Sequence, residues 1–238
     1  MKKNKTNVSQ ARTAYGMIAP SMLIIVGLGF FPVLFTLWFS LNDVNPGSLA
    51  TDFIGLKNYT EILTTDAFWN SLKITLYFSL MSVVVQIVLG TLASMLLNQN
   101  FKGRGFVRGI MLIPWAVPTI VNANLWKWIF NANAGILNKV LLKLHLINEN
   151  VVWLGNGKLA INMIILSDTW KMLPLVIIML LAGLQTVSND VKEASIIDGA
   201  NAWQRFKTVY FPALKPMYIV VLVLRTIQTI RVLILYIL

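Results

Sequence analysis

Long apolar segments alternate with short polar ones along this chain of 238 residues. A helix that crosses the hydrocarbon core of a bilayer needs about 20 predominantly apolar residues. Five segments meet this requirement, at residues 17–41, 74–97, 109–126, 159–181 and 217–238. The pattern therefore predicts an all-α, polytopic membrane protein in which five transmembrane helices form a bundle.

The polar segments between these helices predict the orientation, because cytoplasmic loops carry an excess of Lys and Arg. The tail and the loops after the second and fourth apolar segments together hold 11 basic residues, against 6 on the opposite side. No charge occurs at residues 13–42, which is too long for the apolar part of a cleaved signal peptide, about 7–15 residues. We expect a retained first span, with residues 1–16 as a cytoplasmic tail.

The low content of charged residues indicates that lipid solvates this chain. Hydrophobic residues make up 57% of it and charged residues 12%, about half of the ~25% that is typical of soluble domains. The formal net charge of +11 could by itself suggest a nucleic-acid partner. The basic residues, however, cluster between apolar segments and form no single stripe. We therefore expect contact with a lipid bilayer and none with nucleic acid.

Residue types that are absent or rare exclude several kinds of site. The chain has no cysteine and one histidine, His145, which excludes disulfides, thiolate catalysis and multi-histidine metal sites. It also lacks the G-x4-G-K-[ST] phosphate loop, so it is not itself an ATPase of that type. Neither paired carboxylates nor a nucleophile–base pair is visible. We therefore expect no catalytic residue, cofactor or metal in this chain.

The polar segment at residues 186–216, on the predicted cytoplasmic side, has the signals of two short helices. Ser188, Asn189 or Asp190 can cap the first helix, and Gly199 can end it in a left-handed conformation. A second short helix is predicted at residues 202–210, before prolines that bracket the entry to the last span. The expected product is a helix–turn–helix at the base of the membrane. An ordinary amphipathic surface loop is the alternative.

The spacing of residues in this segment resembles a known signature. Glu193, Ala194, Ser195, Asp198, Gly199 and Pro212 belong to a stretch that reads E-A-S-x3-G-x9-V-x-F-P. It resembles the cytoplasmic coupling signature of membrane subunits of binding-protein-dependent ABC importers, roughly E-A-A-x3-G-x9-I-x-L-P. The resemblance implies that these residues form a loop that docks on a separate ATPase.

Further motifs resemble the maltose/multiple-sugar permease group of that family. They lie at residues 102–119, 125–138, 153–155, 173–175 and 181–185. The resemblance implies half of a sugar importer in the bacterial plasma membrane. Its partners would be a second, similar permease, a dimer of cytoplasmic ATPase subunits that bind ATP, and an extracytoplasmic sugar-binding protein.

Polar residues within the predicted spans are candidates for the substrate path, because charge is costly inside a membrane. They are Asn122, Asn124, Asp168 and Lys171. Asp168 and Lys171 lie three positions apart on one helix, where they could pair, either in the path or in a structural role. The asparagines could instead serve helix packing. Tryptophans at span ends are expected to be interfacial anchors, with stacking on a sugar as the alternative for one of them.

The organisation expected from the resemblance is one permease domain over residues 1–238, with the importer core at 71–238. Permeases of this group usually have a sixth span after the fifth, and we expect this chain to lack it. Arg225 and Arg231 on the fifth span are expected to face the bundle or a partner subunit. The alternatives are a truncated remnant that does not transport and a secondary transporter driven by ions.

Overall fold

The structure is a computed structural model that describes residues 8–44 and 51–237, with backbone alone at 8–10, 51 and 232–237. Lys2, Lys3 and Lys5 of the predicted tail, and Leu238 of the predicted fifth span, lie outside the described residues. The chain divides into two compact units, Met1–Asn70 and Ser71–Leu238. Each unit is considered by itself.

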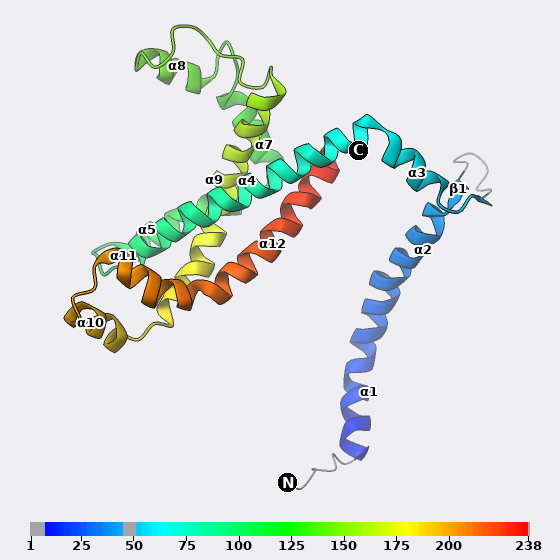
Figure 1. Cartoon of the computed structure of the whole chain (residues 1–238), viewed down its shortest axis with the longest axis horizontal. Helices are drawn as coiled ribbons and strands as arrows, with labels where there is room; N and C mark the ends of the chain where they lie inside the picture. The colour runs from blue at the N-terminus through cyan, green and yellow to red at the C-terminus, as the bar shows by residue number, and fades with distance from the viewer. Residues whose placement is uncertain (1–7, 45–50, 238) are drawn as a thin grey trace. The chain divides into compact units, whose positions relative to one another are not determined.

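The first unit consists mainly of one long apolar helix (Figure 1). It comprises α1 (Val8–Ile25), a π turn η1 (Val26–Phe30) and α2 (Phe31–Ser40). Two short antiparallel strands, β1 (Asn42–Val44) and β2 (Thr51–Phe53), and helix α3 (Lys57–Thr64) follow. The predicted first span is confirmed as a helix, and no residue of it with a described side chain is buried within the chain.

The second unit is a bundle built on three long helices, α4, α9 and α12, and Figure 1 shows α9 crossing behind α4. In chain order its elements are α4 (Asp66–Leu97), which begins before the unit boundary, α5 (Arg104–Met111), α6 (Ile113–Ala116), α7 (Thr119–Ile129), α8 (Ile136–Lys143), α9 (Gly157–Gln185), α10 (Asn189–Ile197), α11 (Ala202–Arg205), a π turn η2 (Phe206–Tyr210) and α12 (Phe211–Ile237). Helices α7 and α8 lie at one end of the bundle, and α10 and α11 at the other.

The core of this bundle lies between α9 and α12 and is closed by α4. The buried apolar cluster is formed by Val176, Leu180, Leu184, Leu214 and Val221. Helix α4 comes close to α9 at Gly90, where a Cβ atom would lie 2.7 Å from Cγ1 of Val176. Small residues at such positions allow membrane helices to pack at short range, since lipid supplies no hydrophobic force between them.

The third predicted span, residues 109–126, is wrong as a single straight helix. The structure has two segments, Arg104–Ala116 and Thr119–Ile129, which meet at an angle of 93°. Pro118 has no N–H to continue the helix, and it forces Val117 before it into an extended conformation, at φ −68° and ψ 128°. The described residues therefore contain four helices long and apolar enough to cross a membrane, or up to five if the bent pair is one span.

The prediction of a separate helix at residues 202–210 is also wrong, because one helical segment runs from Ala202 to Arg231. The π turn η2 lies directly before Phe211-Pro212, just as η1 lies before Phe31-Pro32. In both turns the N–H of the phenylalanine bonds to the carbonyl five residues earlier. In an α-helical turn the proline ring would clash with a backbone carbonyl of the preceding turn, and in the wider π turn this carbonyl lies farther from the ring. A proline can therefore lie inside each helix without ending it.

Replacement of Gly90 by valine tests the close approach of α4 and α9. We expect Gly90→Val to lower the free energy of unfolding by about 1–3 kcal/mol, because the new side chain would overpack against Val176. Gly16→Val is the control, since nothing lies within 4 Å of its Cβ position. Thermal unfolding of the purified chain in detergent measures both. Equal midpoints for the two variants would contradict the close approach.

Candidate functional site

A buried ion pair joins the three long helices of the bundle. Nη2 of Arg225, on α12, lies 2.6 Å from Oδ2 of Asp168, on α9. Gln86, on α4, donates from Nε2 to the same oxygen at 2.9 Å and accepts from Nε of Arg225 at 2.7 Å. The side chain of Arg225 is 2% exposed and that of Asp168 is 14% exposed. The three side chains therefore form one network in the middle of the bundle.

Asp168 and Lys171, which could pair by their spacing, form no ion pair with each other among the described residues. Asp168 pairs with Arg225, whereas Nζ of Lys171 donates to Oγ1 of Thr119, at the start of α7, at 2.6 Å. Residues three apart on a helix point in directions that differ by about 60°, and here α12 and α7 provide partners on the two sides. Arg225 faces the bundle as expected. Arg231 is exposed within the chain.

A cavity of about 290 Å³ lies beside this network, between α4, α7 and α9. Three of the four predicted substrate-path residues, Asn122, Asp168 and Lys171, line it. The fourth, Asn124, does not, because its exposed side chain donates to the carbonyl of Ile120 on its own helix. The other polar and aromatic residues of the lining are Phe78, Thr119, Trp126, Lys127, Phe130 and Ser167.

The cavity lining has hydrogen-bonding capacity that the described residues leave unused. Oδ1 of Asp168 accepts no hydrogen bond from them, since both donors go to Oδ2. The ammonium of Lys171 has three donors, of which one is used on Thr119. Oδ1 of Asn122 and Nε1 of Trp126 also lack a partner among the described residues, but both atoms are fully buried. The lining can therefore offer an acceptor on Asp168 and donors on Lys171 to a ligand.

Trp126 has a different environment from the exposed tryptophans at the span ends. The ring of Trp126 lines the cavity and contacts Trp170 edge-on, with the two centroids 5.9 Å apart. Trp115 and Trp128 are exposed, as interfacial anchors are. Of the described tryptophans, Trp126 is therefore the one placed to stack on a ligand in this cavity.

The polar segment after α9 has a well-defined fold at the opposite end of α9 and α12 from α7 and α8. Ser188 is the cap among the three candidates, and its Oγ accepts from the backbone N–H of Val191 at 3.4 Å. Gly199 ends α10 with a φ of +72°, as predicted. Asn201 and Gln204 form a capping box that the sequence analysis missed, although the Asn-x-x-Gln spacing was a signal for it.

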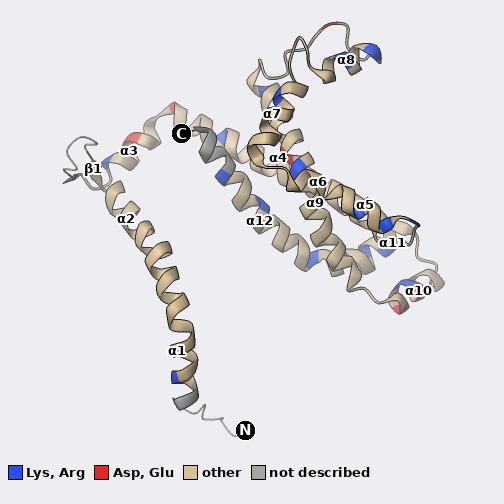
Figure 2. Ribbon diagram, turned by 180° about the vertical axis from the view of Figure 1, so that it is seen from behind, with Lys and Arg blue, Asp and Glu red and all other residues tan. Residues whose placement is uncertain are grey.

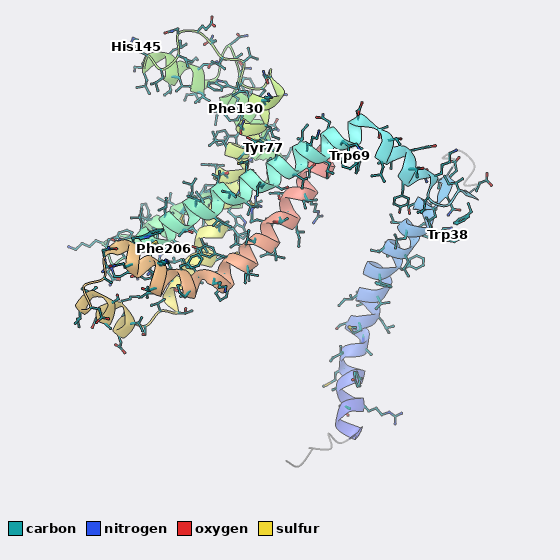
Figure 3. All side chains as sticks on the ribbon, viewed as in Figure 1. Trp38, Trp69, Tyr77, Phe130, His145 and Phe206 are labelled. Atoms are coloured by element: carbon teal, nitrogen blue, oxygen red, sulfur yellow. The ribbon has the colours of Figure 1, made fainter. Side chains whose placement is uncertain are left out.

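Helix α10 has no buried residue within the chain. Glu193, Ala194 and Asp198 are exposed, whereas Ser195 is half-buried and donates to the carbonyl of Lys192 at 2.6 Å. Ile197 is 85% exposed and Trp203, on α11, is 70% exposed. Figure 3 shows Phe206 at this end of the unit and His145 at the other. The segment therefore offers a surface with apolar, small and acidic side chains to a partner.

Comparison with known proteins then decides the family. Residues 86–236 match the family described as "Binding-protein-dependent transport system inner membrane component". The chain is 40% identical over 229 residues to the trehalose/maltose transport system permease protein MalF of Thermococcus litoralis, covering 96% of this chain and 77% of that protein. The chain belongs to this family of transport permeases.

Two further relatives and a solved structure agree with this assignment. The permease is 34% identical over 214 residues to the inner membrane ABC transporter permease protein YcjO of Escherichia coli, which covers 89% of this chain and 73% of that protein. It is 30% identical over 230 residues to the trehalose transport system permease protein SugA of Mycobacterium tuberculosis, which covers 95% and 72%.

The solved structure shares the fold. It is a bacterial ABC transporter involved in the import of the acidic polysaccharide alginate, with a TM-score of 0.80 at 22% identity, covering 96% of this chain and 77% of that one. The predicted all-α, polytopic fold is confirmed. This chain is thus a multi-pass membrane permease subunit of an ABC importer, and the family is one of transporter components.

Figure 2 shows Lys and Arg residues on α5, α10 and α11 near one end of the bundle of the permease, on α7 and α8 at the other end, and also along α12. Among the described residues, no group of three or more His, Asp or Glu side chains could hold a metal ion.

A buried asparagine, which the sequence analysis did not single out, organises the segment after α7. The side chain of Asn138, on α8, is 1% exposed. It donates to the carbonyls of Ala132 and Val151 at 2.9 and 3.0 Å. It accepts from the N–H of Val151 at 3.3 Å and from Nε1 of Trp153 at 2.8 Å. One amide thus fixes the loops on both sides of α8.

Removal of this amide tests its role. We expect Asn138→Ala to destabilise the segment at residues 130–155 by about 2–4 kcal/mol, since several buried polar groups would each lose a partner at about 1–3 kcal/mol. Limited proteolysis of the purified permease would report earlier cleavage there. Asn148→Ala is the control, because Asn148 is an exposed amide in the same segment. Unchanged cleavage of the Asn138 variant would refute this role.

Proposed function

We propose that this permease forms half of the translocation pathway of an ATP-driven importer of small carbohydrates. The observation that carries the proposal is the cavity beside Asp168, with its unused acceptor and donors and the indole of Trp126. Sugar hydroxyls both donate and accept hydrogen bonds, so a lining with both kinds of group suits them. The names of the relatives, which include trehalose and maltose permeases, support the same class of substrate.

Three residues have proposed roles in sugar binding. Oδ1 of Asp168 accepts from a hydroxyl, and the two free N–H groups of Lys171 donate to others. The ring of Trp126 covers an apolar face of the sugar. Asn122 lies on the same wall and donates to Oγ of Ser167 at 3.1 Å. Asn124, which lies outside the cavity, has no role in this proposal.

The partners proposed for this chain follow from its uncovered surfaces and its family. A second, similar permease completes the pathway, and lipid or that permease covers the exposed first span. An extracytoplasmic binding protein delivers the sugar. A dimer of ATPase subunits binds ATP and receives α10, whose exposed Glu193 has no partner among the described residues. A basic residue of the ATPase would pair with it.

The proposed orientation places the amino terminus and the α10–α11 segment in the cytoplasm, where ATP is found. The larger number of basic residues on that side in the sequence supports it. Docking on the ATPase uses Glu193, Ala194, Ser195, Asp198 and Gly199, with Pro212 at the start of the following helix. Gly199 sets the turn between α10 and α11 through its left-handed conformation. The family assignment favours this ATP-driven scheme over transport driven by ions.

A lysine substitution tests the sugar site. We expect Lys171→Met, measured in the complete importer with its ATPase and binding protein, to raise the sugar concentration for half-maximal uptake at least about tenfold. A hydrogen bond to a charged group contributes about 1.5–3 kcal/mol. Uptake of labelled trehalose and maltose is the measurement. Lys158→Met, at the exposed start of the same helix, is the control. Equal uptake by the two variants would contradict the sugar site.

A carboxylate substitution tests the docking surface. We expect Glu193→Gln to reduce co-purification of the ATPase with the permease and to uncouple ATP hydrolysis from uptake, because α10 would lose its ion pair in a partly desolvated interface. Glu149→Gln, an exposed carboxylate at the other end of the bundle, is the matched control. If both variants retain the ATPase equally and transport equally, α10 does not dock through Glu193.

A further inference from the structure

The two donors that hold Asp168 both bind the same oxygen. Nη2 of Arg225 donates to Oδ2 at 2.6 Å, and Nε2 of Gln86 donates to Oδ2 at 2.9 Å. Oδ1, by contrast, accepts nothing from the described residues, while the side chain lines the cavity. The network thus fixes the carboxylate and leaves one of its two oxygens unoccupied.

The network also gives the carboxylate of Asp168 an oppositely charged partner within the bundle. A lone ion in a bundle core is strongly disfavoured, and a pair is tolerated only when further hydrogen bonds complete it. Gln86 supplies one such bond to each ion. Gln228 accepts from Nη1 of Arg225 at 2.6 Å. The guanidinium is thereby bound on three of its nitrogens, and Asp168 is neutralised without the use of Oδ1.

We propose that Arg225 and Gln86 are positioning residues, which hold the carboxylate of Asp168 by its Oδ2 and turn its Oδ1 toward a sugar hydroxyl in the cavity. This inference rests on the proposed function. Neither residue touches the sugar, since Arg225 is fully buried behind the carboxylate and neither side chain lines the cavity. Their effect on transport passes through Asp168.

A purely structural ion pair is the competing explanation, and a charge exchange separates the two. In the double variant Asp168→Arg with Arg225→Asp, the pair across α9 and α12 is kept, but the cavity loses its carboxylate. We expect the complete importer to assemble at near wild-type yield. We expect half-maximal uptake of trehalose or maltose to need at least about ten times more sugar, with loss of sugar-stimulated ATP hydrolysis.

Two milder variants test the same role without requiring that the importer tolerate the charge exchange. Arg225→Lys keeps the charge but removes the bond from Nε to Gln86, and Gln86→Leu removes one donor to Oδ2. We expect each to raise the half-maximal sugar concentration about three- to tenfold, with unchanged assembly and an unchanged maximal rate. Arg231→Lys, an exposed arginine on the same helix, is the control and should leave both parameters as in the wild type.

The outcomes separate a positioning role of Arg225 and Gln86 from a purely structural ion pair, and both from the proposed function. Wild-type uptake in the exchanged variant, or unchanged sugar dependence in both Arg225→Lys and Gln86→Leu, would overturn the positioning role and leave the pair as a structural tie. A wild-type importer that takes up neither trehalose nor maltose would overturn the proposed function, and this inference with it.

Discussion

The ion pair between Asp168 and Arg225 is the interaction on which the organisation of the bundle depends. Loss of either partner would leave the other charge without its counterion inside the bundle, which is strongly destabilising. The pair requires α9 and α12 to face each other at one register, and Gln86 brings α4 to the same point. The apolar cluster around Leu180 and Val221 then fills the space between the same helices. The polar network and the apolar cluster therefore favour the same arrangement of α4, α9 and α12.

The hydrophobic pattern predicted the long helices well, because length and polarity alone decide what can cross a bilayer. Local signals were also sufficient for the cap at Ser188 and the left-handed end at Gly199. Pro118 is a local signal of the same kind, and it lies inside the charge-free segment that predicts the third span. The 93° bend lies at this proline, where Val117 before it has an extended conformation.

The contents of the site could be predicted only in part. Asn122, Asp168 and Lys171 were found because polar residues in apolar spans are unusual. Their partners could not be found, since Arg225 lies 57 positions from Asp168 and Thr119 lies 52 from Lys171. Residues so far apart in the sequence are brought together by the packing of helices, and no local sequence pattern predicts that packing. The same reason hid Asn138, whose bonds join two loops that meet only in the folded chain.

The break at Val117 and Pro118 has a consequence for what fills the cavity. Backbone that leaves the helical pattern at membrane depth is tolerated only where protein covers it or where it borders water. The break is followed directly by Thr119, which is part of the cavity wall. Water in the cavity would satisfy this condition, and a solute would then enter by exchange with water. Selectivity would then depend on whether the lining forms better hydrogen bonds with the solute than with the water that the solute displaces.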